Sequence, residues 1–258
     1  TVDTPLDIGR LELPPSPGSS EPMEVSPGAL GVTLRTLLHD ALVESDNPAY
    51  SRLIDFAGMH RLNSLMWTAG LSQTRVRQRF GIPNLTPESN LYAPEVHLSQ
   101  DGAPVLLLPE RRMTAEIPPL NLPGTIVGHS YFDWKVRRAI PFLEDPKTRN
   151  EMREKNYASL RDLQRLLTAI VDPELQSDRT DIALSDDHRR LLRTLMSEQP
   201  DPVEDVPYAE VEAYHRPLLP GIQRVIPDRD RILYINKMGQ AFGFYIDCAY
   251  IEDLQTGK

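Results

Sequence analysis

The stretch VTLRTLLHDALVESDNPAYSRLID, residues 32–55, predicts two helices joined by a turn. Thr33 can cap the first helix, because its side-chain oxygen can accept a hydrogen bond from an unpaired amide of the first turn. The apolar residues that follow fall on one helical face: Leu34, Leu37, Leu38, Ala41 and Leu42. Ser45-Asp46-Asn47-Pro48 then interrupts the pattern with residues that favour turns and caps. We therefore expect the first helix to end at Glu44 and Asn47 to cap the second.

A second informative stretch, YINKMGQAFGFYIDCAYI, spans residues 234–251. Its β-branched and aromatic residues predict two β-strands, at 232–236 and 242–251, around a connection that contains glycine. Lys237-Met238-Gly239 lies where the first strand is expected to end. Taken alone, it is an ordinary strand-end lysine beside a turn glycine, and Ser45-Asp46-Asn47 alone is a capping turn. The occurrence of both, first on a helix and then on a strand, favours a more specific interpretation.

In this order the two motifs resemble those of class A β-lactamases and penicillin-binding proteins, a family of serine hydrolases. Ser45-Asp46-Asn47 looks like the family's S-D-N motif, and Lys237-Met238-Gly239 looks like its K-T-G or K-S-G motif. The resemblance implies an α+β, β-lactamase/transpeptidase-like fold, with an α-helical subdomain and part of an antiparallel sheet. It further implies one domain over residues 1–258, divided into a mostly helical subdomain at 31–200, a long insertion or loop region at about 71–155, and a sheet element at 231–258.

The same resemblance implies acyl transfer through an acyl-enzyme, on a β-lactam, a peptidoglycan stem peptide or a related amide. In that chemistry Ser45 relays a proton to the leaving nitrogen, and Asn47 orients the substrate amide. Lys237 holds the substrate carboxylate and tunes Ser45, while the backbone N–H of Gln240 is one oxyanion donor. The predicted site residues are Ser45, Asn47 and Lys237 for catalysis, with Met238, Gly239 and Gln240 for substrate binding.

Three departures from the family pattern limit this prediction. No serine has a lysine three residues later, and the family's S-x-x-K precedes S-D-N by roughly 60 residues, so we expect the nucleophile upstream of Thr1. Met238 replaces a hydroxyl residue that helps to bind the substrate carboxylate. The deacylating pattern E-x-x-L-N is missing, since the stretch from Glu116 to Asn121 is one residue too long. An acyl-enzyme is therefore expected to turn over slowly, as in a penicillin-binding protein.

The two ends of the chain bear on the same prediction. The chain starts at Thr1 and stops at 253–258, which is typical of a hairpin turn with no second strand. We expect truncation at both ends, with flanking strands of the sheet absent, so that this segment alone is inactive and poorly stable. An alternative is a catalytically inactive binding or scaffold protein with the same fold, which Met238 and the missing glutamate pattern favour.

Composition excludes several other classes of protein. A net charge of −9 disfavours nucleic-acid binding, which requires a clustered excess of lysine and arginine. The single cysteine, Cys248, excludes an internal disulfide and a multi-cysteine zinc site, and the histidines show no paired metal spacing, so we expect no cofactor and no metal. No apolar run approaches the roughly 20 residues that span a bilayer. The family resemblance implies a small-molecule or peptidoglycan-derived substrate as the partner, and a periplasmic or extracellular, cell-envelope location.

The remaining segments carry weaker predictions. We expect the second helix to stop at Gly58, and further helices at 61–68, at 131–143, and after the capping residues Ser159 and Ser185. Residues 105–108 favour a strand, and 201–230 a surface excursion rich in proline and acidic residues. Arg189-Arg190 is typical of a solvated helix face. Tyr234-Ile235-Asn236 matches a catalytic Y-x-N triplet only by coincidence.

Overall fold

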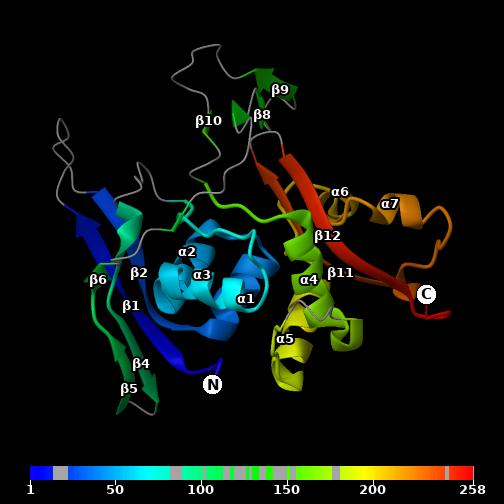
Figure 1. The fold of residues 1–258 in the computed structure, drawn as a ribbon. Coiled ribbons are helices and arrows are strands. Elements are labelled where there is room, and N and C mark those ends of the chain that lie inside the picture. Colours follow the sequence, from blue (N-terminus) through cyan, green and yellow to red (C-terminus); the bar gives the residue numbers. More distant parts are fainter. Residues whose placement is uncertain are drawn as a thin grey trace. The chain divides into compact units, whose positions relative to one another are not determined.

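The computed structural model describes residues 1–13, 23–81, 89–100, 103–112, 117–118, 126–127, 130–133, 138–141, 150–151, 155–175, 181–241 and 244–257. The chain forms two compact units, residues 1–119 with 154–158 and residues 120–153 with 159–258 (Figure 1). Each unit combines helices with antiparallel strands, which confirms the predicted α+β class. The expected division into 31–200 and 231–258 stays a prediction, and most of the near-match from Glu116 to Asn121 lies outside the described residues.

The first unit contains a four-stranded antiparallel sheet in the order β2-β1-β4-β5. Its strands are β1 (Pro5–Leu13), β2 (Met23–Thr33), β4 (Val96–Gln100) and β5 (Ala103–Leu108). Leu6 pairs with Leu98 and Ile8 with Val96, so the alternate residues of β1 place two apolar side chains on one face. The strand predicted at 105–108 is thereby confirmed as part of β5. A short ladder joins β3 (Tyr92–Ala93) to β6 (Arg111–Arg112), after the 3-10 turn Ser89–Leu91.

Strand β2 leads directly into the helices α1 (Leu34–Leu42), α2 (Asn47–Ala57) and α3 (Met59–Thr68). Thr33 caps α1 by accepting a hydrogen bond from the Thr36 amide, as predicted. The helix ends at Leu42 and not at Glu44. The predicted cap of α2 is wrong: Asp46 caps it, and Asn47 is already helical. Gly58, with φ +78°, ends α2 as expected.

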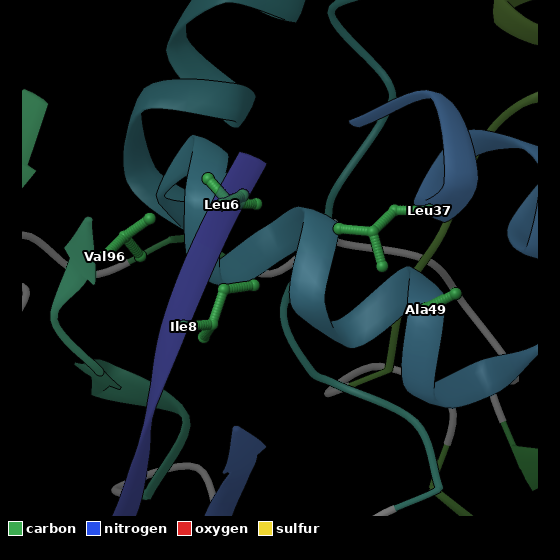
Figure 2. Close-up of a cluster of buried hydrophobic side chains, with 5 residues drawn as sticks. All are labelled: Leu6, Ile8, Leu37, Ala49 and Val96. Carbon is green, nitrogen blue, oxygen red and sulfur yellow. The ribbon is translucent and has the colours of Figure 1, made fainter. Parts of the chain in front are cut away.

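A buried apolar cluster joins α1 and α2 to the sheet. Figure 2 shows Leu6 and Ile8 of β1, Val96 of β4, Leu37 of α1 and Ala49 of α2, and all five are at most 1% exposed. Burial of a large aliphatic side chain contributes about 1.5–3 kcal/mol. Because Leu37 and Ala49 lie on either side of the turn at residues 43–46, this cluster fixes the position of that turn on the sheet.

Residues 74–80 form an extended segment, called below the clamped segment, that side chains hold in place. Five consecutive amides of this segment, those of residues 76–80, donate to side-chain oxygens. The acceptors are Asn63, Asn156 (for two of the amides), Asn90 and Ser51. Within the segment, Arg75 alone makes strand-like pairing, a single bridge to Tyr157. Buried backbone groups require partners, and polar side chains from four places in the chain supply them here.

The second unit is built around the hairpin of β11 (Ile232–Ala241) and β12 (Phe244–Asp253), in which Ile232 pairs with Asp253 and Ala241 with Phe244. Both strands were predicted; β11 extends five residues beyond the expected end, and β12 is shifted by two. Helix α5 (Asp186–Ser197) packs on β11, and α4 (Leu160–Val171) packs on β12. Ser159 and Ser185 cap these helices as predicted. The 3-10 turn Pro173–Leu175 follows α4, and the 3-10 turn Arg229–Arg231 precedes β11.

One prediction about this unit needs correction. The expected helix at 131–143 is wrong, because β8 (Ser130–Asp133) and β9 (Arg138–Pro141) pair as antiparallel strands. Aromatic residues favour a strand, and Pro141 cannot donate the backbone hydrogen bond that a helix interior requires. Most residues of the segment at 201–230 are exposed, as predicted for a surface excursion, and the segment contains the helices α6 (Tyr208–His215) and α7 (Leu219–Ile222). A two-residue ladder joins β7 (Ile126–Val127) to β10 (Asn150–Glu151).

Candidate functional site

The Ser45-Asp46-Asn47 turn has a constrained backbone. Ser45 has φ +57°, a left-handed conformation that non-glycine residues rarely adopt. The next residue, Asp46, makes two hydrogen bonds. Its amide donates to the Asp40 carbonyl at 2.9 Å, and its Oδ1 accepts from the Ala49 amide at 2.6 Å. These bonds fix the turn, and both Ser45 and Asn47 are exposed. Such a conformation persists only when the surrounding structure determines it, and it is frequent at functional sites.

A row of polar residues on α2 continues from this turn along the clamped segment. Asn47, Ser51 and Asp55 are spaced by four residues and so share one helical face. Ser51 Oγ donates to the Phe80 carbonyl at 2.8 Å and accepts from the Phe80 amide at 2.9 Å. At the Asn47 end of this row, a Cβ added to Gly81 would lie 3.3 Å from Cβ of Asn47, so Gly81 lies directly against Asn47.

The ion pair at the other end of this row is fully buried. Arg79 Nε and Nη2 lie 2.7 and 2.6 Å from Asp55 Oδ1, and the two side chains are 2% and 0% exposed. Arg79 Nη2 also donates to the Tyr92 carbonyl, and Arg111 Nη2 donates to the Asp55 carbonyl. Burial, opposed by the negative charge of Asp55, lowers the pKa of Arg111. The ion pair therefore connects the clamped segment to α2, the helix that begins at the candidate residue Asn47.

Lys237, Met238, Gly239 and Gln240 are consecutive residues of β11 in the second unit. Alternation along the strand places Lys237 on the same face as Leu233 and Ile235, while Met238 lies on the opposite face and is 7% exposed. Gly239 and Gln240 follow near the hairpin end of the strand, and among the described residues nothing lies within 4 Å of a Cβ added to Gly239. Gly239 itself has no side chain that would keep a ligand away from the backbone.

The opposite face of β11 carries a polar cluster inside an apolar one. Tyr234 Oη donates to Asp247 Oδ2 at 2.7 Å, and Asn236 Nδ2 donates to Asp247 Oδ1 at 2.7 Å and to the His215 carbonyl at 2.8 Å. Burial, with the bond to Asp247, raises the pKa of Tyr234. The Y-x-N match is therefore structural. Burial also lowers the pKa of His215, and the positive charge of Lys237 lowers it further.

The structure places Ser45 in the turn before α2, Asn47 as the first residue of α2, and the four residues from Lys237 to Gln240 on β11. The two groups belong to different units. Sequence reasoning missed Ser51, Asp55 and Gly81. The spacing of Asn47, Ser51 and Asp55 by four residues could have indicated a polar face on α2, and nothing local indicated its contact with Gly81.

Two general features of the described residues bear on the kind of site. Within these ranges, no three His, Cys, Asp or Glu side chains gather in a way that could hold a metal ion. Of the helices that the structure describes, none has the length and apolar character that a bilayer crossing requires. Besides the Asp46 carboxylate, which caps α2, the two motifs contribute the hydroxyl of Ser45, the amide of Asn47 and the ammonium of Lys237.

Comparison with known proteins supplies the family. A search among curated proteins finds no match. A family model described as the Beta-lactamase enzyme family matches residues 12–258, nearly the whole chain and including both motifs. This family supports a serine hydrolase-type function in general terms. The resemblance drawn from Ser45-Asp46-Asn47 and Lys237-Met238-Gly239 is thereby confirmed at the level of the family, and the chain belongs to the Beta-lactamase enzyme family.

Proposed function

We propose that this chain carries the S-D-N and K-x-G parts of a serine hydrolase that forms an acyl-enzyme with a β-lactam or a peptidoglycan-type amide. The nucleophilic serine belongs to an S-x-x-K motif that the 258 residues do not contain, and we place it upstream of them. Ser45 relays the proton to the leaving nitrogen, and Asn47 holds the substrate amide. Lys237 binds the substrate carboxylate, and the Gln240 amide donates to the oxyanion.

The observation that carries this proposal is the backbone of the Ser45 turn. A solvent-exposed serine in a left-handed conformation has a cost, since such conformations are sparsely populated for residues with a Cβ. The Asp46 cap and the cluster around Leu37 and Ala49 hold the residue in that conformation. Preorganisation of this kind is what a proton-relay hydroxyl requires, because the group must be in place before the transition state forms.

The sequence itself favours slow hydrolysis of the acyl-enzyme. Deacylation requires a general base that positions a water molecule near the acyl group. The family supplies this base from an E-x-x-L-N pattern, which the 258 residues do not contain. Met238, whose side chain is buried, offers no hydroxyl to the substrate carboxylate. We therefore favour an enzyme that acylates and turns over slowly, as a transpeptidase or carboxypeptidase does, over an efficient β-lactamase.

The alternative is a binding protein of the same fold without turnover, and Met238 is the residue that favours it. The first test is the sequence of the complete reading frame. If that frame contains no S-x-x-K motif, the enzyme proposal is wrong. A frame with S-x-x-K is expressed and treated with a fluorescent penicillin, and a covalently labelled band is expected. Replacement of the motif serine by alanine removes the band, and Lys237→Ala slows labelling about a hundredfold, the usual cost of one electrostatic contact to the reacting group.

Lys155→Ala serves as the matched control, since it removes a lysine of the first unit that has no proposed role. Its labelling rate should equal that of the unmodified protein. An absence of labelling in a folded protein that has S-x-x-K would favour the binding protein, as would a rate that Lys237→Ala leaves unchanged. We also propose export to the periplasm or cell envelope, which fractionation of the native host tests directly.

A further inference from the structure

Tyr50 connects the first turn of α2 to the clamped segment through both ends of its side chain. It lies three residues after Asn47, so the two residues are neighbours on the helix surface. Its ring lies against the ring of Phe80, with centroids 5.1 Å apart and planes inclined by 31°. Its hydroxyl oxygen accepts a hydrogen bond of 2.8 Å from Asn156 Nδ2. The ring therefore contacts the residue that precedes Gly81, and Gly81 lies against Asn47.

Asn156 is the residue through which the Tyr50 hydroxyl reaches the clamped segment. Its Oδ1 atom accepts from the amides of Arg77 and Gln78 at 2.7 and 2.9 Å. Its Nδ2 atom donates to the Gln78 carbonyl at 3.1 Å as well as to Tyr50 Oη. A carboxamide has two donor hydrogens and an oxygen with two lone pairs, so these four bonds use its whole capacity. Asn156 thus links Tyr50 to residues 77 and 78 in one defined orientation.

Two consecutive residues of α2 attach the clamped segment at two different points. Ser51 binds the amide and the carbonyl of Phe80, and Tyr50 reaches residues 77 and 78 through Asn156. Attachment at one point fixes where the segment lies, whereas a second point also fixes its direction. Asn47 and Gly81 are both exposed, so a change in that direction alters a space that a substrate can reach from solvent.

We propose that Tyr50 is a positioning residue of the S-D-N site, which sets the direction of residues 80 and 81 and so the width of the space beside Asn47. This proposal rests on the proposed acyl transfer and deepens it, because Tyr50 belongs to neither motif. Tyr50 acts through residues 80 and 81 and not on the reacting atoms. Loss of its hydroxyl slows acylation more than it lowers stability, because a small displacement of a positioning group has a large effect on rate.

The first experiment uses the complete protein and the fluorescent penicillin of the acylation test. Tyr50→Phe removes only the hydroxyl and keeps the ring that lies against Phe80. At saturating penicillin it should slow covalent labelling about tenfold, the effect of one lost hydrogen bond on a barrier, and it should leave the thermal melt nearly unchanged. Tyr92→Phe is the matched control, because it removes a hydroxyl of the same unit whose side chain has no proposed role. Its labelling rate should equal that of the unmodified protein.

Two variants of Asn156 separate positioning from stability. Asn156→Asp keeps an acceptor for both amides and can accept from the Tyr50 hydroxyl, so it should be labelled at nearly the normal rate. Asn156→Ala removes all four bonds and should slow labelling at least as much as Tyr50→Phe, at temperatures where its melt shows a folded protein. The proposal is wrong if Asn156→Asp is labelled as slowly as Asn156→Ala, or if Tyr50→Phe is labelled at the normal rate.

A second experiment follows residue 81 without any chemistry, so it stays decisive if the complete protein is not labelled. In NMR spectra of the ¹⁵N-labelled chain, Tyr50→Phe should shift the backbone amide signal of Gly81 and the side-chain amide signal of Asn47. Tyr92→Phe should shift neither signal. If the protein is not labelled by penicillin and both signals shift, the acyl transfer is refuted and the placement of Gly81 by Tyr50 is supported. If neither signal shifts, the role of Tyr50 is refuted, whatever the labelling shows.

Discussion

Loss of Asp55 is expected to destabilise the first unit far more than loss of a comparable exposed aspartate. Asp55 is 0% exposed and binds Arg79, which is 2% exposed, through contacts of 2.6 and 2.7 Å. Asp55→Ala leaves a buried guanidinium that has lost its counter-ion and retains the Tyr92 carbonyl as an acceptor for Nη2. Removal of one partner of a buried pair costs about 3–5 kcal/mol. Against a total stability of about 5–15 kcal/mol for a typical domain, this is a large fraction.

The assay is urea unfolding followed by tryptophan fluorescence. The chain has two tryptophans, Trp67 and Trp134, so Trp134→Phe leaves Trp67 as the reporter. Trp67 Nε1 donates to the Thr74 carbonyl at 2.8 Å, and therefore reports on the clamped segment to which Arg79 belongs. The double variant Asp55→Leu with Arg79→Met should cost less than the sum of its single changes, because it leaves no buried charge of this pair without a partner.

The matched control is the exposed pair of Asp3 and Arg35 in the same unit, 2.5 Å apart, with side chains 58% and 48% exposed. Asp3→Ala should change the free energy of unfolding little, because solvent screens exposed ion pairs. If Asp55→Ala costs no more than Asp3→Ala, the reasoning from burial is wrong. Simple additivity of the single changes at residues 55 and 79 would refute it as well.

Three further predictions concern the candidate residues. Gly81→Ala places a Cβ 3.3 Å from Asn47 at φ +73° and should destabilise the unit by about 1–2 kcal/mol, measured by urea unfolding; an unchanged midpoint would contradict the contact. Asp46→Ala should cost about 1 kcal/mol through loss of the cap bond to Ala49, whereas Asp46→Asn retains most of it, and equal losses in both would argue against capping. Lys237→Met should raise the pKa of His215 toward 6.5, because it removes a positive charge that opposes protonation; if a proton NMR titration of the imidazole shows no rise in this pKa, the charge of Lys237 does not act on His215.

The sequence was most informative where the determining interactions are local. Thr33, Ser159 and Ser185 were identified as caps because a cap bond reaches only three residues along the chain. The choice between Asp46 and Asn47 failed, because both side chains can cap and the decision depends on the left-handed Ser45 and on the Asp40 carbonyl.

Polar contacts between residues far apart in the chain could not be predicted from the sequence. The clamped segment alternates like a strand, with arginine at residues 75, 77 and 79, but its amides from 76 to 80 bind side chains. Asn156, which binds two of these amides, lies 78 and 79 residues from them. The family could be recognised from two short motifs, while Gly81 beside Asn47 and the bond between Tyr50 and Asn156 required coordinates.

The clamped segment has a consequence for how this protein can change over evolution. In a sheet, neighbouring strands hold one another through backbone groups, which every substitution except one to proline retains. In the clamped segment, each amide from residue 76 to residue 80 depends on one asparagine or serine side chain. A point mutation of Ser51, Asn63 or Asn90 therefore loosens one position and leaves the others held. Substitutions of these buried side chains can thus release the residues that lead to Gly81 one at a time, and each leaves one backbone amide beside the Ser45 turn without its acceptor.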